Sequence, residues 1–135
     1  MSVCTFIASN CPLKEVSPKA DDNFYLLTFE NVRDYTDKTY GVYLEWNYTD
    51  GRAEQILKYI KEALKETDSV EFWHVWLMDF FEYKDSPVIY KRTISISEMT
   101  IRDIKEIDDA EIWNKPDKQM PSRPSFYCLK IESGK

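Results

Sequence analysis

Two neighbouring segments in the middle of the chain show the clearest pattern of apolar and polar positions. Between residues 40 and 46 every second side chain is large and apolar, which predicts a β-strand with one buried face. Those side chains are Tyr40, Val42, Leu44 and Trp46. From residue 52 to 66 the apolar side chains recur every three or four positions, at Ala53, Ile56, Leu57, Ile60, Ala63 and Leu64. This spacing predicts an amphipathic helix, with Asp50 as its N-cap.

The next apolar segment, EFWHVWLMDFFEY at residues 71–83, has large side chains on both sides of a strand. One side carries Phe72, His74, Trp76, Met78 and Phe80, and the other carries Trp73, Val75, Leu77 and Phe81. Because both sides are apolar, we expect a central strand with a packed layer against each face. What covers the second face decides whether this segment is core or binding surface.

The remaining chain contains further strands and connections. Apolar and aromatic runs predict strands at residues 3–9, 24–29, 88–96 and 125–131. The polar segment 31–38 is interpreted as a connection. Residues 114–124 contain three prolines, which exclude a regular element there, and we interpret this segment as a loop.

A short second helix is predicted at residues 100–107. Thr100 is its expected N-cap, and Asp103, three residues later, can return a hydrogen bond in the manner of a capping box. Met99 and Ile104 stand at the positions of a hydrophobic staple. These signals place the start of the helix at Thr100.

The order of the predicted elements indicates a fold class. From about residue 40 it runs strand, helix, strand, strand, helix, strand, which matches the split β-α-β arrangement of the ferredoxin-like kind. We therefore expect one α+β domain over residues 1–135, with a mostly antiparallel sheet and two helices on one face. The strands at 3–9 and 24–29 are expected to extend the sheet or to cover its other face.

Composition and charge exclude several classes of partner. The formal net charge is −6 and no basic stripe is present, so we expect neither nucleic acid nor a membrane surface as a partner. No apolar stretch has the length of a bilayer span, and the start lacks a signal-peptide pattern, so we expect a cytoplasmic protein. The three cysteines include no CxxC pair, which fits reduced thiols.

Cofactor and metal sites are also disfavoured by the composition. The chain has three separated glycines, whereas a dinucleotide fingerprint or a phosphate loop needs several close together. It has one histidine, which excludes sites built on two imidazoles. We therefore expect no cofactor and no metal.

His74 is the candidate centre of a catalytic site. With a cysteine as nucleophile, and with Glu45 or Asp79 orienting the ring, it would form a site of the Cys-His type. Carboxylates beside aromatic residues also fit a sugar-processing site. A buried histidine satisfied by a neighbour on the sheet is the favoured interpretation, because catalytic groups are recognised only by their geometry.

The second face of the strand at residues 70–83 is the candidate binding surface. The residues proposed for it are Tyr43, Trp73, Val75, Leu77 and Trp113. Large exposed apolar patches mark interaction sites, and tryptophan and tyrosine are frequent anchors there. The competing interpretation is that the strands at 3–9 and 24–29 cover this face. The basic loop at 114–124 is a second candidate for partner contact.

These patterns do not determine a function. The favoured hypothesis is a small acidic interaction module without catalysis, which binds a protein partner or its own copy. Its charge suits a basic partner. The alternatives are a small hydrolase- or sugar-processing-type enzyme with a site near His74, and a small-molecule sensor of the ferredoxin-like type.

Overall fold

The computed structural model describes residues 2–17, 24–44, 49–77, 88–105 and 125–134. Within these residues six strands form one sheet. The strands are β1 (Ser2–Ser9), β2 (Leu27–Thr28), β3 (Tyr40–Leu44), β4 (Ser69–Leu77), β5 (Val88–Ser95) and β6 (Ser125–Glu132). The helical elements are the 3-10 helix η1 (Glu30–Asp34), α1 (Asp50–Ala63) and a short helix at residues 101–105. The predicted α+β class is confirmed.

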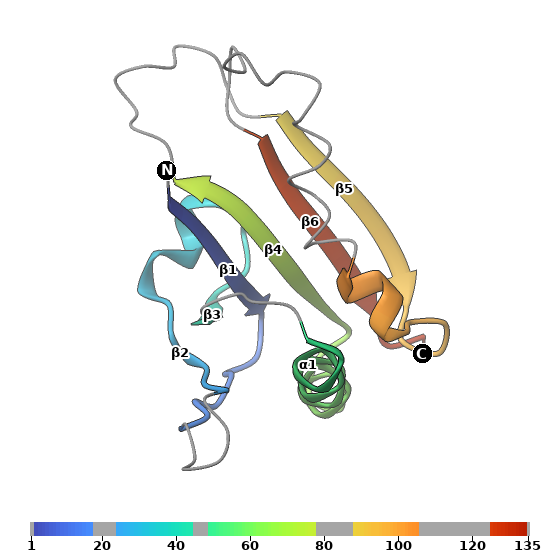
Figure 1. Cartoon of the computed structure of the whole chain (residues 1–135). Coiled ribbons are helices and arrows are strands. Elements are labelled where there is room, and N and C mark those ends of the chain that lie inside the picture. The colour runs from blue at the N-terminus through green and yellow to red at the C-terminus, as the bar shows by residue number, and fades with distance from the viewer. Residues whose placement is uncertain (1, 18–23, 45–48, 78–87, 106–124, 135) are drawn as a thin grey trace.

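The strands lie in the order β2-β3-β1-β4-β6-β5, and β5 with β6 is the parallel pair among otherwise antiparallel neighbours (Figure 1). Since β3 and β4 are both antiparallel to β1, they are parallel to each other, and with α1 they form a split β-α-β unit. The strand inside that split is β1 rather than a strand of the segment after residue 40. The ferredoxin-like order is therefore not confirmed.

The two N-terminal strands take different places from each other. β2 extends the sheet at one edge, as expected, but β1 lies in the interior of the sheet. The side chains of Phe6, Ile7 and Ala8 are all 0% exposed, so both faces of β1 are covered. A strand that is apolar on both faces suits an interior position, where neighbours on both sides also satisfy its backbone.

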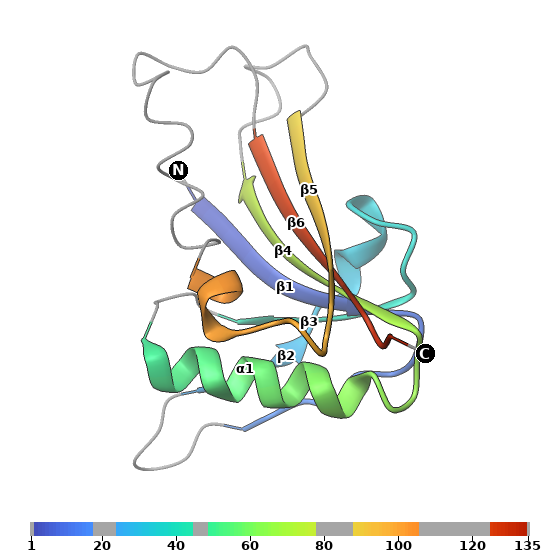
Figure 2. The same cartoon turned by 90° about the vertical axis from the view of Figure 1, so that its right-hand side faces the viewer.

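Both helices predicted from the sequence lie on one face of the sheet, which we call the helix face (Figure 2). Ile56 and Ile60 of α1, and Ile104 of the short helix, belong to the same buried cluster as the helix-face residues of the sheet. Those sheet residues are Ile7, Val42, Leu44, Val70, Phe72, Tyr127, Leu129 and Ile131. The apolar stripe that the helical spacing predicted is therefore the side of α1 that packs against the sheet.

The helix starts test two predicted caps. Thr49, not Asp50, is the N-cap of α1, and its Oγ1 accepts a hydrogen bond from the Arg52 backbone N–H at 3.0 Å. The backbone at Thr49 is extended, whereas Asp50 is already helical and places its charge in the first turn, where the helix dipole favours it. The second prediction is confirmed, because the Thr100 backbone N–H donates to Asp103 Oδ2 at 2.8 Å.

The opposite face of the sheet is covered by the segment around η1, and we call it the η1 face. Val32 of η1 packs in a second buried cluster with Phe6, Ala8, Trp73, Val75 and Cys128, and Phe29 and Tyr35 lie against the same cluster. β1 and β2 extend the sheet, which is one of the two alternatives expected for residues 3–9 and 24–29, and Phe29 also contributes to the cover of this face. The rest of the cover comes from the segment 31–38, interpreted from the sequence as a polar connection, whose apolar residues Val32 and Tyr35 both pack against the cluster.

Gly41 allows η1 to approach the sheet closely. A Cβ at Gly41 would lie 2.9 Å from both Cβ and Cγ2 of Val32, which is shorter than a normal contact. We expect Gly41→Ala to lower the free energy of unfolding by about 1–3 kcal/mol through overpacking. Gly51→Ala is the matched control, because nothing lies within 4 Å of a Cβ there and alanine favours the helix. Urea unfolding followed by circular dichroism measures both, and equal stabilities for the two variants would contradict this explanation.

Candidate functional site

His74 is buried on the helix face. It is 2% exposed, and its Nδ1 is hydrogen-bonded to Thr5 Oγ1 at 2.8 Å. Thr5 and Tyr127 are its neighbours across the sheet on β1 and β6. The two carboxylates proposed to orient it, Glu45 and Asp79, lie outside the described residues. The structure thus brings His74 together with a hydroxyl group on a neighbouring strand, and the catalytic hypothesis remains a prediction.

Three of the residues proposed for binding meet in the cluster of the η1 face. Trp73 is 3% exposed and Val75 is 0% exposed, while Tyr43 is half-buried at the margin of the cluster. The side chain of Leu77 and the whole of Trp113 lie outside the described residues. Because the chain itself covers Trp73 and Val75, these two contribute to the core rather than to an exposed surface in this conformation.

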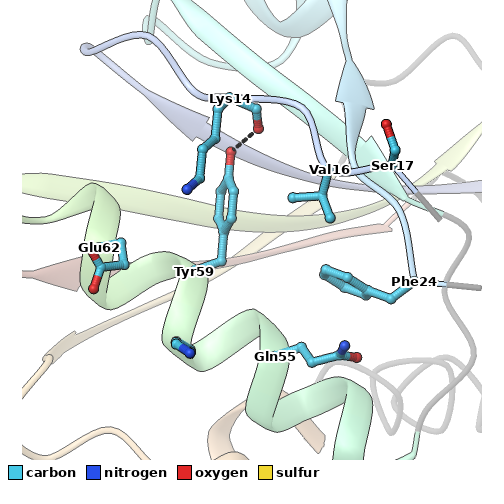
Figure 3. A pocket seen from close by; sticks show the side chains of 8 residues that line it. Lys14, Val16, Ser17, Phe24, Gln55, Tyr59 and Glu62 are labelled. Atoms are coloured by element: carbon cyan, nitrogen blue, oxygen red, sulfur yellow. Dashed lines mark hydrogen bonds between the residues drawn. The ribbon is translucent and has the colours of Figure 1, made fainter. Parts of the chain in front are cut away.

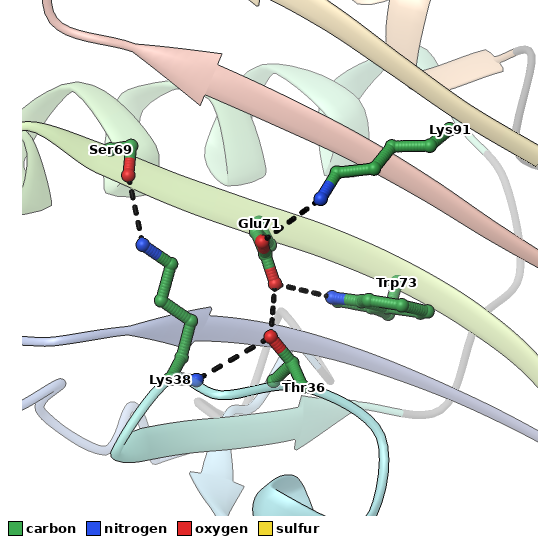
Figure 4. Close-up of polar contacts among 6 residues, drawn as sticks. All are labelled: Thr36, Lys38, Ser69, Glu71, Trp73 and Lys91. Atoms are coloured by element: carbon green, nitrogen blue, oxygen red, sulfur yellow. Dashed lines mark hydrogen bonds and ion pairs between the residues drawn. The ribbon is translucent and has the colours of Figure 1, made fainter.

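Glu71 is a buried carboxylate that joins three elements on the η1 face (Figure 4). It is 4% exposed, and its Oε1 accepts hydrogen bonds from Thr36 Oγ1 at 2.5 Å and from Trp73 Nε1 at 2.9 Å. Its Oε2 lies 3.8 Å from the Nζ of Lys91 on β5. A buried charge is tolerated when it is paired and hydrogen-bonded in this way.

Lys38 makes a second polar contact between the η1 segment and β4. Its Nζ donates to Ser69 Oγ at 2.9 Å, and the residue is only 8% exposed. Together with Thr36 and Glu71, it fastens the end of the η1 segment onto the sheet. Burial raises the pKa of the nearby Cys128 thiol to about 12. The negative charge of Glu71 adds to this rise, and the neighbouring lysines partly oppose it. We therefore interpret this network as an anchor for the cover of the η1 face.

An open hollow lies elsewhere, between the N-terminal loop and α1 (Figure 3). Its volume is about 390 Å³, within the range of small ligand pockets. The residues that line it are Lys14, Val16, Ser17, Phe24, Gln55, Lys58, Tyr59 and Glu62. Val16, Phe24 and the ring of Tyr59 form an apolar floor, and polar and charged side chains from both banks form the rim.

A second hollow of about 270 Å³ continues along the same bank of α1. Its lining is Pro12, Leu13, Lys14, Tyr59, Glu62, Ala63 and Glu66, so it shares Lys14, Tyr59 and Glu62 with the first hollow. We call the two hollows together the α1 groove. One bank is the segment 12–17 with Phe24, and the other is α1 with the residues that follow it.

Two contacts hold the banks of the α1 groove in place. The Tyr59 hydroxyl donates to the Lys14 backbone carbonyl at 2.6 Å, as Figure 3 shows. The hydroxyl is protonated at neutral pH and can donate, and burial raises the pKa of Tyr59 further from neutrality, to about 12. Cys11 adds a second link, because its Sγ donates to the Glu66 carbonyl at 2.7 Å. These contacts keep the groove open as a preformed shape.

The segment 14–17 is also tied to the edge of the sheet. The backbones of Val16 and Leu26 exchange two hydrogen bonds, both 2.9 Å long, as an isolated antiparallel bridge. Glu15 Oε2 accepts from the Thr28 backbone N–H at 2.8 Å. This segment therefore runs alongside β2 and extends the edge of the sheet beyond it.

The α1 groove was not predicted from the sequence. Tyr59 falls at the margin of the apolar stripe of α1, three residues after Ile56, and that position is the one available signal. A tyrosine at such a margin can bury its ring and offer its hydroxyl to a neighbouring segment. The other bank comes from a loop whose position only long-range packing determines.

Comparisons of the chain with protein-family models, with curated proteins and with solved structures found no match. None of the helices in the described residues combines the length and apolar content needed to span a bilayer. Over the same part of the chain, no group of three or more His, Cys, Asp or Glu side chains could hold a metal ion. The geometry itself is therefore the basis for a functional proposal.

Proposed function

We propose that this protein is a small acidic interaction module without catalysis, which holds a segment of a partner protein in the α1 groove. The observation that carries the proposal is the preformed groove with an apolar floor and a polar rim. Sites that bind through one buried apolar anchor have this form, in which polar groups around the anchor give orientation.

The electrostatics of the chain favour a basic partner. Along the α1 groove, Lys14 and Lys58 are balanced by Glu62 and Glu66, so the local charge gives no preference. The net charge of −6 then dominates at long range, and it speeds the association of a positively charged partner at low ionic strength. A basic partner is also what the composition predicts.

A peptide-display selection tests the groove. A random library of twelve-residue peptides is panned against the whole chain, and the enriched peptides are measured by isothermal titration calorimetry. We expect peptides with one large apolar residue and flanking lysine or arginine. We expect Val16→Lys, which places a charge on the apolar floor, to weaken their binding about tenfold or more, equivalent to at least about 1.4 kcal/mol.

Two further variants make this selection decisive. Leu27→Lys is the matched control, because Leu27 is an exposed apolar residue on the neighbouring strand and lies outside the groove lining. Gln55→Trp fills the hollow from α1 and serves if Val16→Lys fails to fold, which circular dichroism reports. If no peptide is enriched, or if the enriched peptides bind the groove variants as tightly as the wild-type chain, the groove is not the binding site.

A further inference from the structure

Residues 15–17 form an open backbone edge. Val16 directs both its N–H and its C=O to Leu26. In extended chain, the backbone groups of adjacent residues point in opposite directions, so those of Glu15 and Ser17 point away from Leu26. Within the part of the chain that the structure describes, neither residue makes a backbone–backbone hydrogen bond. This edge therefore presents donors and acceptors in the pattern of an unpaired strand.

The open edge stands beside the apolar hollow. Lys14 and Val16, two residues apart, both line the hollow, as expected for side chains on one side of an extended segment. A further strand paired with this edge would direct every second side chain toward the side of the segment that faces the hollow. One of them would then reach the floor formed by Val16, Phe24 and Tyr59. Backbone pairing and an apolar anchor are thus available at one place.

We propose that the partner segment binds as an added β-strand along Glu15–Ser17 and places one large apolar side chain in the α1 groove. This inference rests on the proposed function and specifies its mode of recognition. In strand addition, backbone hydrogen bonds supply affinity and pockets for alternate side chains supply specificity. The occupant is an extended segment of another protein with basic residues flanking its anchor, because the chain carries a net charge of −6.

Backbone methylation of an enriched peptide tests strand addition. Each peptide N–H is replaced in turn by N–CH₃, and affinity is measured by calorimetry against the whole chain. We expect losses of about tenfold or more at alternate positions and small effects between them, because only every second N–H faces the pairing edge. If no alternation appears while Val16→Lys still abolishes binding, strand addition is overturned and the groove remains the site.

A matched pair of variants tests the same edge from the side of the protein. Glu15→Pro and Glu15→Ala both remove the carboxylate that accepts from Thr28, but only proline also removes the backbone N–H. We expect about tenfold weaker peptide binding for Glu15→Pro than for Glu15→Ala. Equal affinities for the two variants overturn the proposal. Concentration-dependent dimerisation in gel filtration that Glu15→Pro abolishes would overturn it as well, because a second copy would then be the occupant.

Discussion

Replacing Phe6 by alanine is expected to lower the free energy of unfolding by about 3–5 kcal/mol, the range for large core residues. Phe6 is 0% exposed and sits at the centre of the cluster on the η1 face. Its ring centroid lies 4.8 Å from that of Phe29, 5.5 Å from that of Tyr35 and 5.9 Å from that of Trp73. The substitution therefore removes contacts to both the sheet and its cover.

Chemical denaturation monitored by tryptophan fluorescence and circular dichroism measures this loss. Leu27→Ala is the control, because Leu27 is 37% exposed on an edge strand and its loss is expected to cost less than about 1 kcal/mol. Phe6→Leu separates volume from ring contacts, and aromatic pairs add about 0.5–1.5 kcal/mol each beyond area. A Phe6→Ala protein as stable as Leu27→Ala would show that the cluster is not packed as described.

Replacing Glu71 by alanine is expected to lower the free energy of unfolding by about 3 kcal/mol, because it leaves buried donors without their acceptor. Those donors are the Trp73 indole N–H and the Thr36 hydroxyl. The ion pair with Lys91 contributes little to this figure, since its atoms are 3.8 Å apart and the Lys91 side chain is 50% exposed. Most of the loss therefore comes from the unsatisfied hydrogen-bonding groups.

Two other variants separate charge from hydrogen bonding at this position. Glu71→Gln retains an acceptor oxygen and is expected to lose about 1 kcal/mol. Glu62→Ala removes an exposed ion pair with Lys65, whose side chain is 69% exposed, and is expected to change stability by less than about 0.5 kcal/mol. Urea denaturation compares the three proteins. The anchor role of Glu71 fails if Glu71→Ala and Glu62→Ala are equally stable.

The position of Glu71 in the sequence carried a signal for its role. On an alternating strand, Glu71 shares its side with Trp73 and Val75, so an acid stands on an apolar face of a central strand. Such an acid must be exposed by a gap in the cover or satisfied by buried partners. The alternation identifies the residue, but its partners Thr36 and Lys91 come from segments 35 and 20 positions away, which no local pattern connects.

The local pattern alone determined the class of the fold and most of its elements. Alternation at residues 40–46, the apolar stripe at 52–66 and the capping box at Thr100 each depend on neighbours within a few positions, so the sequence specifies them directly. The two apolar sides of residues 70–77 likewise showed that this strand is central. These features follow from the periodicities of strand and helix.

The tertiary structure decided which segments meet. β1 pairs between β3 and β4, so it does not cover the second face of the sheet, and η1 packs there instead. The same strand order places the segment 12–17 beside α1. Strand order depends on backbone pairing across the whole chain, and several orders satisfy the same apolar pattern equally well. The cover of the η1 face and the α1 groove are consequences of that long-range choice, which is why the sequence did not reveal them.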